Sequence, residues 1–250
     1  MGSTLQLIRQ QLSLLVREHD LGAEAIEITA RPLSPDEAIG RTSRKDFPLV
    51  VGRERLIEAQ FRAARGHAYT DMPADYRSSL GELLDLDLSD NARRAFFVAA
   101  ANAVCRHLFD DLRTVHCRND DPERCGPWVA QELLRRFGRI RVGVIGLNPA
   151  IVEAVSDTFG PDMVQVTDLD ATKVGTGLAG VRVCDARRET GALVSRSDIV
   201  LATGTTIANG TVDMITALAE NHGKPLLFYG VTCASAAQLL GYERLCPYAS

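Results

Sequence analysis

The pattern of hydrophobic and polar positions along the chain changes near residue 130. In residues 4–16, TLQLIRQQLSLLV, leucine and isoleucine recur three and four positions apart, which places them on one face of a helix. Residues 25–33, AIEITARPL, alternate apolar and polar side chains as a half-buried strand does, and residues 47–52, FPLVVG, are a second strand candidate. The beginning of the chain is therefore predicted to be a helix followed by strands that pair as a small sheet.

The rest of the first half is predicted to be mostly helical. Residues 53–66, RERLIEAQFRAARG, are expected to form a helix with Gly66 as its C-terminal cap. Residues 78–86 and the long apolar stretch 91–109 are expected to form two more helices. We therefore predict an α+β domain over residues 1–127, with more helix than strand.

From residue 128 onward, short apolar runs alternate with helical segments. The predicted strands lie within residues 140–146, 163–170, 180–185, 198–204 and 225–232, and the predicted helices within residues 128–138, 148–160 and 211–223. Buried parallel strands read as short apolar runs, and this alternation favours a doubly wound parallel sheet. We therefore predict an α/β fold, with a second domain over residues 128–250 that binds its ligand at the carboxyl ends of the strands.

Polar residues follow the first two of these strands. In GLNPA, Gly146 permits a tight turn and Asn148 can cap the next helix, so this helix start either holds an anion or is only a helix start. Asp168 ends the second strand, where nucleotide-binding sheets often carry an acid for ribose hydroxyls, and a solvated turn is the structural alternative. Asn148 and Asp168 are therefore candidate ligand-binding residues.

The loop after the fourth strand, TGTTIANGT at residues 203–211, is the richest candidate of the second domain. Glycine lets backbone N–H groups turn toward a ligand, and threonine hydroxyls add donors without charge, so the loop suits a carboxylate or phosphate. The alternative, in which Asn209 or Thr211 only caps the next helix, leaves the paired threonines without a role. The candidate ligand-binding residues are Thr203, Gly204, Thr205, Thr206, Asn209 and Thr211, with Thr232 after the next strand.

Composition narrows the choice of partners. The formal net charge of -4 argues against a nucleic-acid partner, because phosphate contacts need a cationic face. No window approaches the roughly 20 apolar residues of a bilayer span, and residues 1–30 lack a secretory pattern, so we expect no membrane partner and a cytoplasmic location. The six cysteines are expected to be reduced thiols. A small-molecule ligand is the expected partner, and a homodimer is left open.

Residues 114–126, TVHCRNDDPERCG, gather His116, Cys117 and Cys125, which are donor types that zinc, copper or nickel prefer. The spacing lacks the paired half-sites of structural zinc, so we expect an open metal site that another residue or a chelating ligand completes. Two alternatives remain. In one, Cys117 beside His116 is a low-pKa thiolate and both residues are catalytic. In the other, the segment only starts the next helix, and its cysteines are buried in the packing of the protein.

Residues 66–73, GHAYTDMP, form a second polar cluster, which is expected to be a loop between helices. Loops of this kind carry binding groups when a scaffold presents them. If both loops of the first domain face the strand ends of the second, His67 and Asp71 would lie with His116 and Cys117 in an interdomain cleft, opposite residues 203–211.

Several of these segments together make the chain resemble a known family. The segments, in order, are GHAYTDMP, NAVCRHL, TVHCRNDDPERC, VGVIGLNPA, VTDLD, LATGTTIANGT, YGVT and ERLCPY. With them, most of the chain resembles the Rossmann-like proteins of the family described as "putative heavy-metal chelation". The resemblance implies a small α+β domain similar to the N-terminal domain of enolases, a Rossmann-like domain after it, and a site between the two. It also implies a metal-related role, for which a link to anaerobic corrinoid synthesis has been suggested.

Three functions are compatible with the sequence. The first is an enzyme or chaperone-like protein of metallophore or corrinoid-type metabolism that binds a small anionic or metal-chelating ligand in the interdomain cleft. In it, His116, Cys117 and Cys125 would face a transition metal, which is the cofactor these residues suggest. The second is a nucleotide- or S-adenosylmethionine-binding enzyme such as a methyltransferase, which the absence of a glycine-rich first loop disfavours. The third is a non-catalytic anion sensor.

Overall fold

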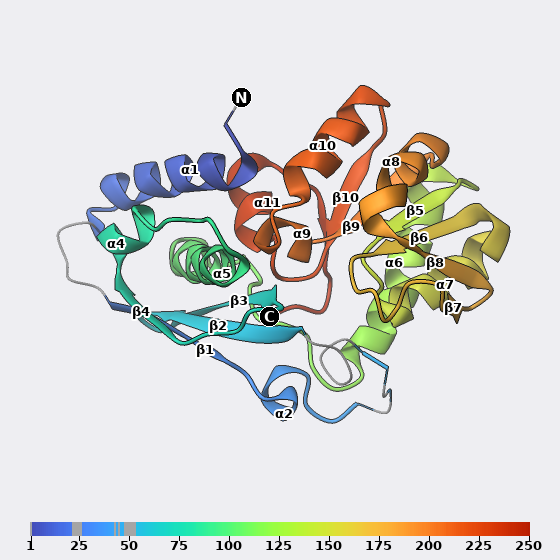
Figure 1. The fold of residues 1–250 in the computed structure, drawn as a ribbon. Helices are drawn as coiled ribbons and strands as arrows, with labels where there is room; N and C mark the ends of the chain where they lie inside the picture. The colour runs from blue at the N-terminus through green and yellow to red at the C-terminus, as the bar shows by residue number, and fades with distance from the viewer. Residues whose placement is uncertain (1, 22–26, 43, 45, 48–53) are drawn as a thin grey trace.

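The computed structural model describes residues 2–21, 27–42, 44, 46–47 and 54–250. These residues form a four-stranded and a seven-stranded sheet, with helices between and around them (Figure 1). The strand predicted at residues 47–52 lies outside the described residues except for Phe47. No helix in the described part of the chain is long and apolar enough to cross a membrane.

The smaller sheet is antiparallel and has the strand order β3-β2-β1-β4. Its strands are β1 (Glu27–Pro32), β2 (Arg55–Phe61), β3 (Ala64–Thr70) and β4 (Tyr76–Ser79), and the helices of this half are α1 (Thr4–Glu18), α2 (Pro35–Ala38), α4 (Leu80–Leu84) and α5 (Asn91–Leu108). Helices α1, α2 and α4 each begin with a serine capping box, in which the serine hydroxyl accepts the third backbone N–H of the helix. The helices predicted at residues 4–16, 78–86 and 91–109 and the strand predicted within residues 25–33 are confirmed.

The helix predicted at residues 53–66 is wrong, because this stretch contains the β2–β3 hairpin. In strand geometry Ile57, Ala59 and Phe61 share one face, and all three are buried where β2 packs against α5. That burial depends on a helix distant in sequence, so local spacing could not reveal it. As a second consequence, the polar cluster at residues 66–73 begins on strand β3 and is not a loop between helices.

The larger sheet has the strand order β11-β10-β9-β5-β6-β8-β7. Its pairs are parallel except for β7, which runs antiparallel to β8. The strands are β5 (Val142–Ile145), β6 (Val164–Asp168), β7 (Gly177–Leu178), β8 (Val181–Asp185), β9 (Ile199–Thr203), β10 (Leu226–Tyr229) and β11 (Arg244–Leu245). In chain order the sheet grows outward from β5 on one side and then from β9 on the other, so the predicted doubly wound α/β fold is confirmed.

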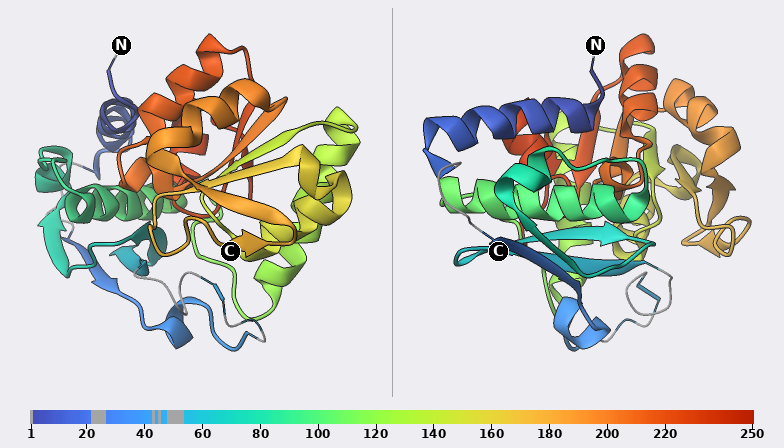
Figure 2. Two further views of the ribbon diagram at one scale, coloured as in Figure 1. Left: turned by 45° about the vertical axis from the view of Figure 1, so that its right-hand side comes forward. Right: turned by 60° about the vertical axis from the view of Figure 1, so that its left-hand side comes forward.

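Helices cover both faces of this sheet (Figure 2). They are α6 (Asp121–Phe137), α7 (Pro149–Phe159), the short 3-10 helix Pro161–Met163, α8 (Ala186–Arg196), α9 (Thr205–Ala208), α10 (Val212–Asn221) and α11 (Ala234–Leu240). Helix α8 is missing from the sequence prediction, because its sequence ARRETGALVSR is mostly polar and buries few apolar side chains. Helix α6 begins at Asp121, so the predicted boundary between residues 127 and 128 lies inside a helix. The division into two domains stays a prediction.

Helix α5 packs on the smaller sheet, on the side where α1 lies (Figure 1). Every residue from Ala95 to Cys105 is buried, because strands β2 and β3 pack on one side of the helix and helices α9 and α11 on another. A side chain at Gly66 would overlap the backbone of Ala99 and Ala103, so this glycine allows β3 to approach α5 closely. Through α5, one hydrophobic core extends from α1 and the small sheet to α10 and α11.

Candidate ligand-binding cleft

A cleft with two lobes lies at the carboxyl ends of β5, β6 and β9. We call the first lobe the thiol lobe, because it is lined by Cys117, Cys125 and Cys246. We call the second the threonine lobe, because Thr203, Thr205, Thr206 and Thr211 line it. The residues common to both lobes are Glu54, Gly146, Asp168, Thr203 and Thr205. The parallel sheet therefore gathers its strand ends at one cleft, as expected for a doubly wound fold.

The turn after β5 is shaped by Gly146. Its φ of +91° is a conformation that other residues rarely adopt, and a side chain there would collide with Thr203. The buried Tyr229 hydroxyl donates a hydrogen bond of 2.7 Å to the Gly146 carbonyl, which fixes the turn against β10. Asn148 then caps helix α7 by accepting the Ile151 N–H at 3.2 Å, so the helix-cap interpretation explains this residue, which also lines the thiol lobe.

Asp168 is placed at the end of β6 and lines both lobes, but its carboxylate is already engaged. One oxygen accepts the Leu147 N–H at 2.7 Å, and the other accepts the Asp170 N–H at 2.8 Å. Lys173 lies 3.5 Å from the same carboxylate and 4.0 Å from that of Asp170. Asp168 therefore holds the loops after β5 and β6 together and is only 8% exposed.

The segment predicted as a threonine loop contains the one-turn helix α9, and most of its hydroxyl hydrogens have partners inside the segment. Thr203 donates to Thr205 Oγ1 at 3.2 Å, and Thr206 donates to the Thr203 carbonyl at 2.7 Å. Thr211 donates to Asn209 Oδ1 at 2.7 Å. The Thr205 hydroxyl hydrogen and the Asn209 Nδ2 group form no hydrogen bond as donors within the described residues. These two side chains are the ones with donors left for a ligand.

His116 lies in the thiol lobe and forms a pair with Tyr69. The Tyr69 hydroxyl is 2.8 Å from His116 Nε2, and the rings meet edge to face at 5.5 Å. Burial lowers the pKa of His116 to about 4, and the neighbouring His67 adds to the effect, so the imidazole is neutral at pH 7. His116 Nδ1 is buried and has no hydrogen-bond partner in the described part of the chain, although the backbone of Ala38 lies near enough to favour the charged ring. Burial also raises the pKa of Tyr69 well above its ordinary value.

His67 and Asp71 do not line either lobe. His67 is 3% exposed and uses both ring nitrogens: Nδ1 accepts the His116 N–H at 3.1 Å, and Nε2 donates to Glu58 at 2.9 Å. Asp71 is exposed and accepts a hydrogen bond from Asn91. His116, Cys117, Thr203 and Thr205 thus line one lobe, while His67 accepts the backbone N–H of His116 from outside it.

The cysteines of the thiol lobe do not have the electrostatics of a reactive thiolate. Burial raises the pKa of Cys117 and raises that of Cys125 to about 12, and the neighbouring thiols act in the same direction. A neutral His116 does not favour the low-pKa thiolate that the sequence left open as an alternative. Cys125 lies on helix α6, and among the described residues no three His, Cys, Asp or Glu side chains are close enough to hold a metal ion.

Glu54, Tyr69, Lys173 and Cys246 line the thiol lobe and were not among the candidate residues. Burial raises the pKa of Glu54 to about 7, while Lys173 lowers it and the carboxylate of Asp168 raises it further. Glu54 and Lys173 had no signal in the sequence, because single charged residues are common in loops. Tyr69 and Cys246 do belong to GHAYTDMP and ERLCPY, two of the segments that carry the family resemblance.

Comparison with known proteins identifies the second half of the chain. Residues 129–242 match the model of the family described as "Putative heavy-metal chelation". This segment belongs to that family. The heavy-metal chelation match includes the ends of β5, β6 and β9 and the whole of residues 203–211, whereas His116, Cys117 and Cys125 precede it and Cys246 follows it. No curated protein matches the chain.

Two solved structures of the heavy-metal chelation family, both of proteins with unknown function, are similar to this chain. The Pyrococcus horikoshii protein is 17% identical, with a TM-score of 0.54 over 95% of this chain and 82% of that one. The Desulfitobacterium hafniense protein is 13% identical, with a TM-score of 0.47 over 74% of this chain and 72% of that one. The first of these likenesses shows a shared fold and nothing about the ligand.

Proposed function

We propose that the cleft binds a small metal-chelating anion, with its metal facing the thiol lobe and its acidic groups facing Thr203 and Thr205. The observation that carries the proposal is the donor set of the thiol lobe, in which one imidazole and three thiols surround a single space. These donors suit soft and borderline metals. Because no three of them form a preassembled site, the metal would arrive as cargo inside a ligand that completes its coordination.

The protonation states fit this role. A neutral His116 can ligate a metal without losing a proton, and its Nδ1 lacks a partner in the described part of the chain. The buried thiols keep their protons until a cation supplies compensating charge, so metal binding should release protons. The nucleotide-enzyme alternative has less support, since the Asp168 carboxylate is occupied by backbone N–H groups of its own loops.

The test uses Co²⁺ and the Co²⁺–citrate complex as probes, with calorimetry and the thiolate charge-transfer absorption as readouts. We expect the complex to bind at least about tenfold more tightly than Co²⁺ alone, because citrate supplies the missing ligands. Cys117→Ser and Cys125→Ser should each weaken the absorption band and weaken binding. Cys184→Ser is the matched control, because Cys184 lies on β8 outside the thiol lobe. If the control weakens binding as much as Cys117→Ser, or if Co²⁺ binds equally well alone, the proposal fails.

Chelator treatment is expected to leave the thermal unfolding transition within about 2 °C of its starting value. The physical reason is that two sheets and a continuous hydrophobic core stabilise the fold without metal, unlike small zinc domains whose folding energy is metal-binding energy. Differential scanning calorimetry before and after chelation, with elemental analysis of both samples, measures the effect. Unfolding on release of a stoichiometric metal would show a structural site instead.

A further inference from the structure

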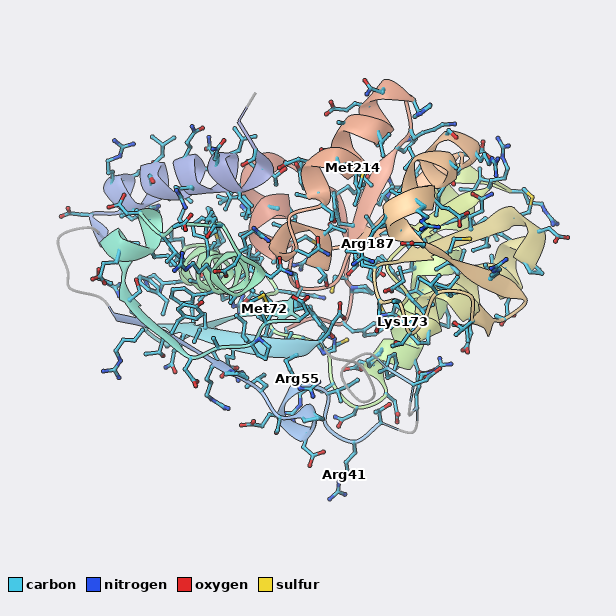
Figure 3. The ribbon with its side chains drawn as sticks, viewed as in Figure 1. Arg41, Arg55, Met72, Lys173, Arg187 and Met214 are labelled. Carbon is cyan, nitrogen blue, oxygen red and sulfur yellow. The ribbon has the colours of Figure 1, made fainter. Side chains whose placement is uncertain are left out.

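The threonine lobe has features that the metal proposal does not use. Its far side is formed by α8 and α10, away from the thiols, and carries Arg187 and Met214 (Figure 3). We propose that this lobe is a separate site for a second ligand, an organic anion with an apolar body, bound through Arg187 and Asn209.

Charge supports an anion at this place. The charged residues of the lobe are Glu54, Asp168 and Arg187. Arg187 donates to the Leu169 carbonyl at 2.8 Å but forms no ion pair with any described residue, so its charge is uncompensated. Asp168 is balanced by Lys173 on the other side. Arg187 is therefore the one cation that lines the lobe, on the opposite side from Lys173 and its carboxylates, and a guanidinium is well suited to a phosphate or carboxylate.

Unused hydrogen-bond donors point to the same place. The Thr205 hydroxyl and the Asn209 Nδ2 group have no acceptor among the described residues, and both side chains line this lobe. At the wall of the lobe, the Thr167 hydroxyl is buried and has no partner within the described structure. Thr206 and Thr190 differ, because their hydroxyls already donate to backbone carbonyls. An anion at Arg187 would supply acceptors for donors that the fold leaves free.

The remaining wall is apolar, which requires a ligand larger than an inorganic ion. It consists of Ile145, Leu169, Ala186, Met214 and Ile215. Met214 is 45% exposed on α10, whose Val212, Ile215 and Ala219 are buried. A ligand body that covers Met214 would remove this surface from water. Since the lobe shares Gly146, Thr203 and Thr205 with the thiol lobe, two ligands bound in the two lobes would meet at the end of β9.

The experiment is calorimetric titration of the full chain in chelator with three probes: adenosine monophosphate, the aromatic carboxylate salicylate, and inorganic phosphate. We expect at least one organic anion to bind, and inorganic phosphate to bind at least tenfold more weakly. Arg187→Gln should weaken the organic anion about tenfold. Arg188→Gln is the matched control, because Arg188 is the next residue, is 85% exposed and does not line the lobe.

Met214→Glu provides a second test, because it places a negative charge on the lobe wall, with Met72→Glu as the control outside the lobe. If adenosine monophosphate binds and its affinity falls in Arg187→Gln and Met214→Glu, the ligand carries a phosphate. The same pattern with salicylate supports a carboxylate ligand. Binding of neither organic probe, or equal losses in Arg187→Gln and Arg188→Gln, would overturn the proposal. Because chelator is present throughout, failure of the metal proposal does not affect this result.

Discussion

Replacing Asn102 by alanine is expected to lower the free energy of unfolding by about 3 to 5 kcal/mol. Asn102 is fully buried in α5 and makes three hydrogen bonds to distant backbone. Its Nδ2 donates to the His67 carbonyl at 2.9 Å and to the Val231 carbonyl at 3.1 Å, and its Oδ1 accepts the Ser235 N–H at 2.7 Å. Truncation leaves the His67 carbonyl and the Ser235 N–H buried without a partner, whereas the Val231 carbonyl still accepts the Ala234 N–H at 3.0 Å. Each buried group without a partner carries a desolvation cost of about 1 to 3 kcal/mol.

These three partners explain why the effect should reach the cleft. Val231 and Ser235 flank Thr232, whose hydroxyl accepts the Tyr69 N–H at 3.1 Å. Asn102 therefore connects β3, which carries Tyr69, to the segment after β10. Urea unfolding measures the change, with Asn91→Ala as control, because Asn91 lies on the same helix and bonds to the exposed Asp71. A loss below about 1 kcal/mol for Asn102→Ala would show that water replaces the asparagine.

The larger sheet could be predicted from the sequence because each of its strands is recognisable from the residues of that strand alone. Each buried parallel strand is a short apolar run between polar turns, and five such runs were placed correctly. Helix α8 was not predicted because most of its surface is exposed and polar. It has too few apolar residues to show the helical spacing of a buried face. The β2–β3 hairpin was not predicted although it has many apolar residues. These residues are buried only because β2 packs against α5, which is distant in sequence.

The candidate cleft shows the same limit. Residues at strand ends were placed at the cleft because topology dictates where parallel strands terminate. Whether each side chain is free was not predictable. The Asp168 carboxylate already accepts the Leu147 N–H, and the Thr206 hydroxyl already donates to the Thr203 carbonyl. The Thr205 hydroxyl only accepts a hydrogen bond, so its hydrogen is available to a ligand. His67 was expected in the cleft, but it hydrogen-bonds to Glu58, its cross-strand neighbour on β2. Tyr69 lies on the same face of β3, two residues nearer the end of the strand, and lines the thiol lobe.

Glu54→Gln and His116→Gln are expected to change the pH dependence of stability in opposite directions. Burial raises the pKa of Glu54 to about 7 from 4.5, so between these values the folded protein holds a proton that the unfolded chain has lost. Raising the pH through this window therefore costs stability. Burial lowers the pKa of His116 to about 4 from 6.5, so the unfolded chain takes up a proton first as the pH falls. Lowering the pH through that window therefore also costs stability.

Between pH 4.5 and 6.5 the two effects oppose each other, each with a slope of up to about 1.4 kcal/mol per pH unit. The unaltered protein should show little net slope from this pair. In Glu54→Gln the free energy of unfolding should rise with pH, because of this pair only His116 still titrates. In His116→Gln the free energy of unfolding should fall with pH, because only Glu54 still titrates. The groups that face Glu54 (Lys173, Asp168, Asp71 and Asp170) and the His67 that faces His116 are the same in every variant, so their contributions cancel in the comparison.

The measurement is urea unfolding of the metal-free protein at four pH values from 4.5 to 7.5, for both single variants and the double variant. The double variant should return to a slope near that of the unaltered protein, because both opposing groups are gone. This closure separates titration from a general loss of packing, which would shift stability equally at every pH. Parallel pH profiles for the two single variants would show that the cleft is well hydrated and that neither group is held in an unusual protonation state.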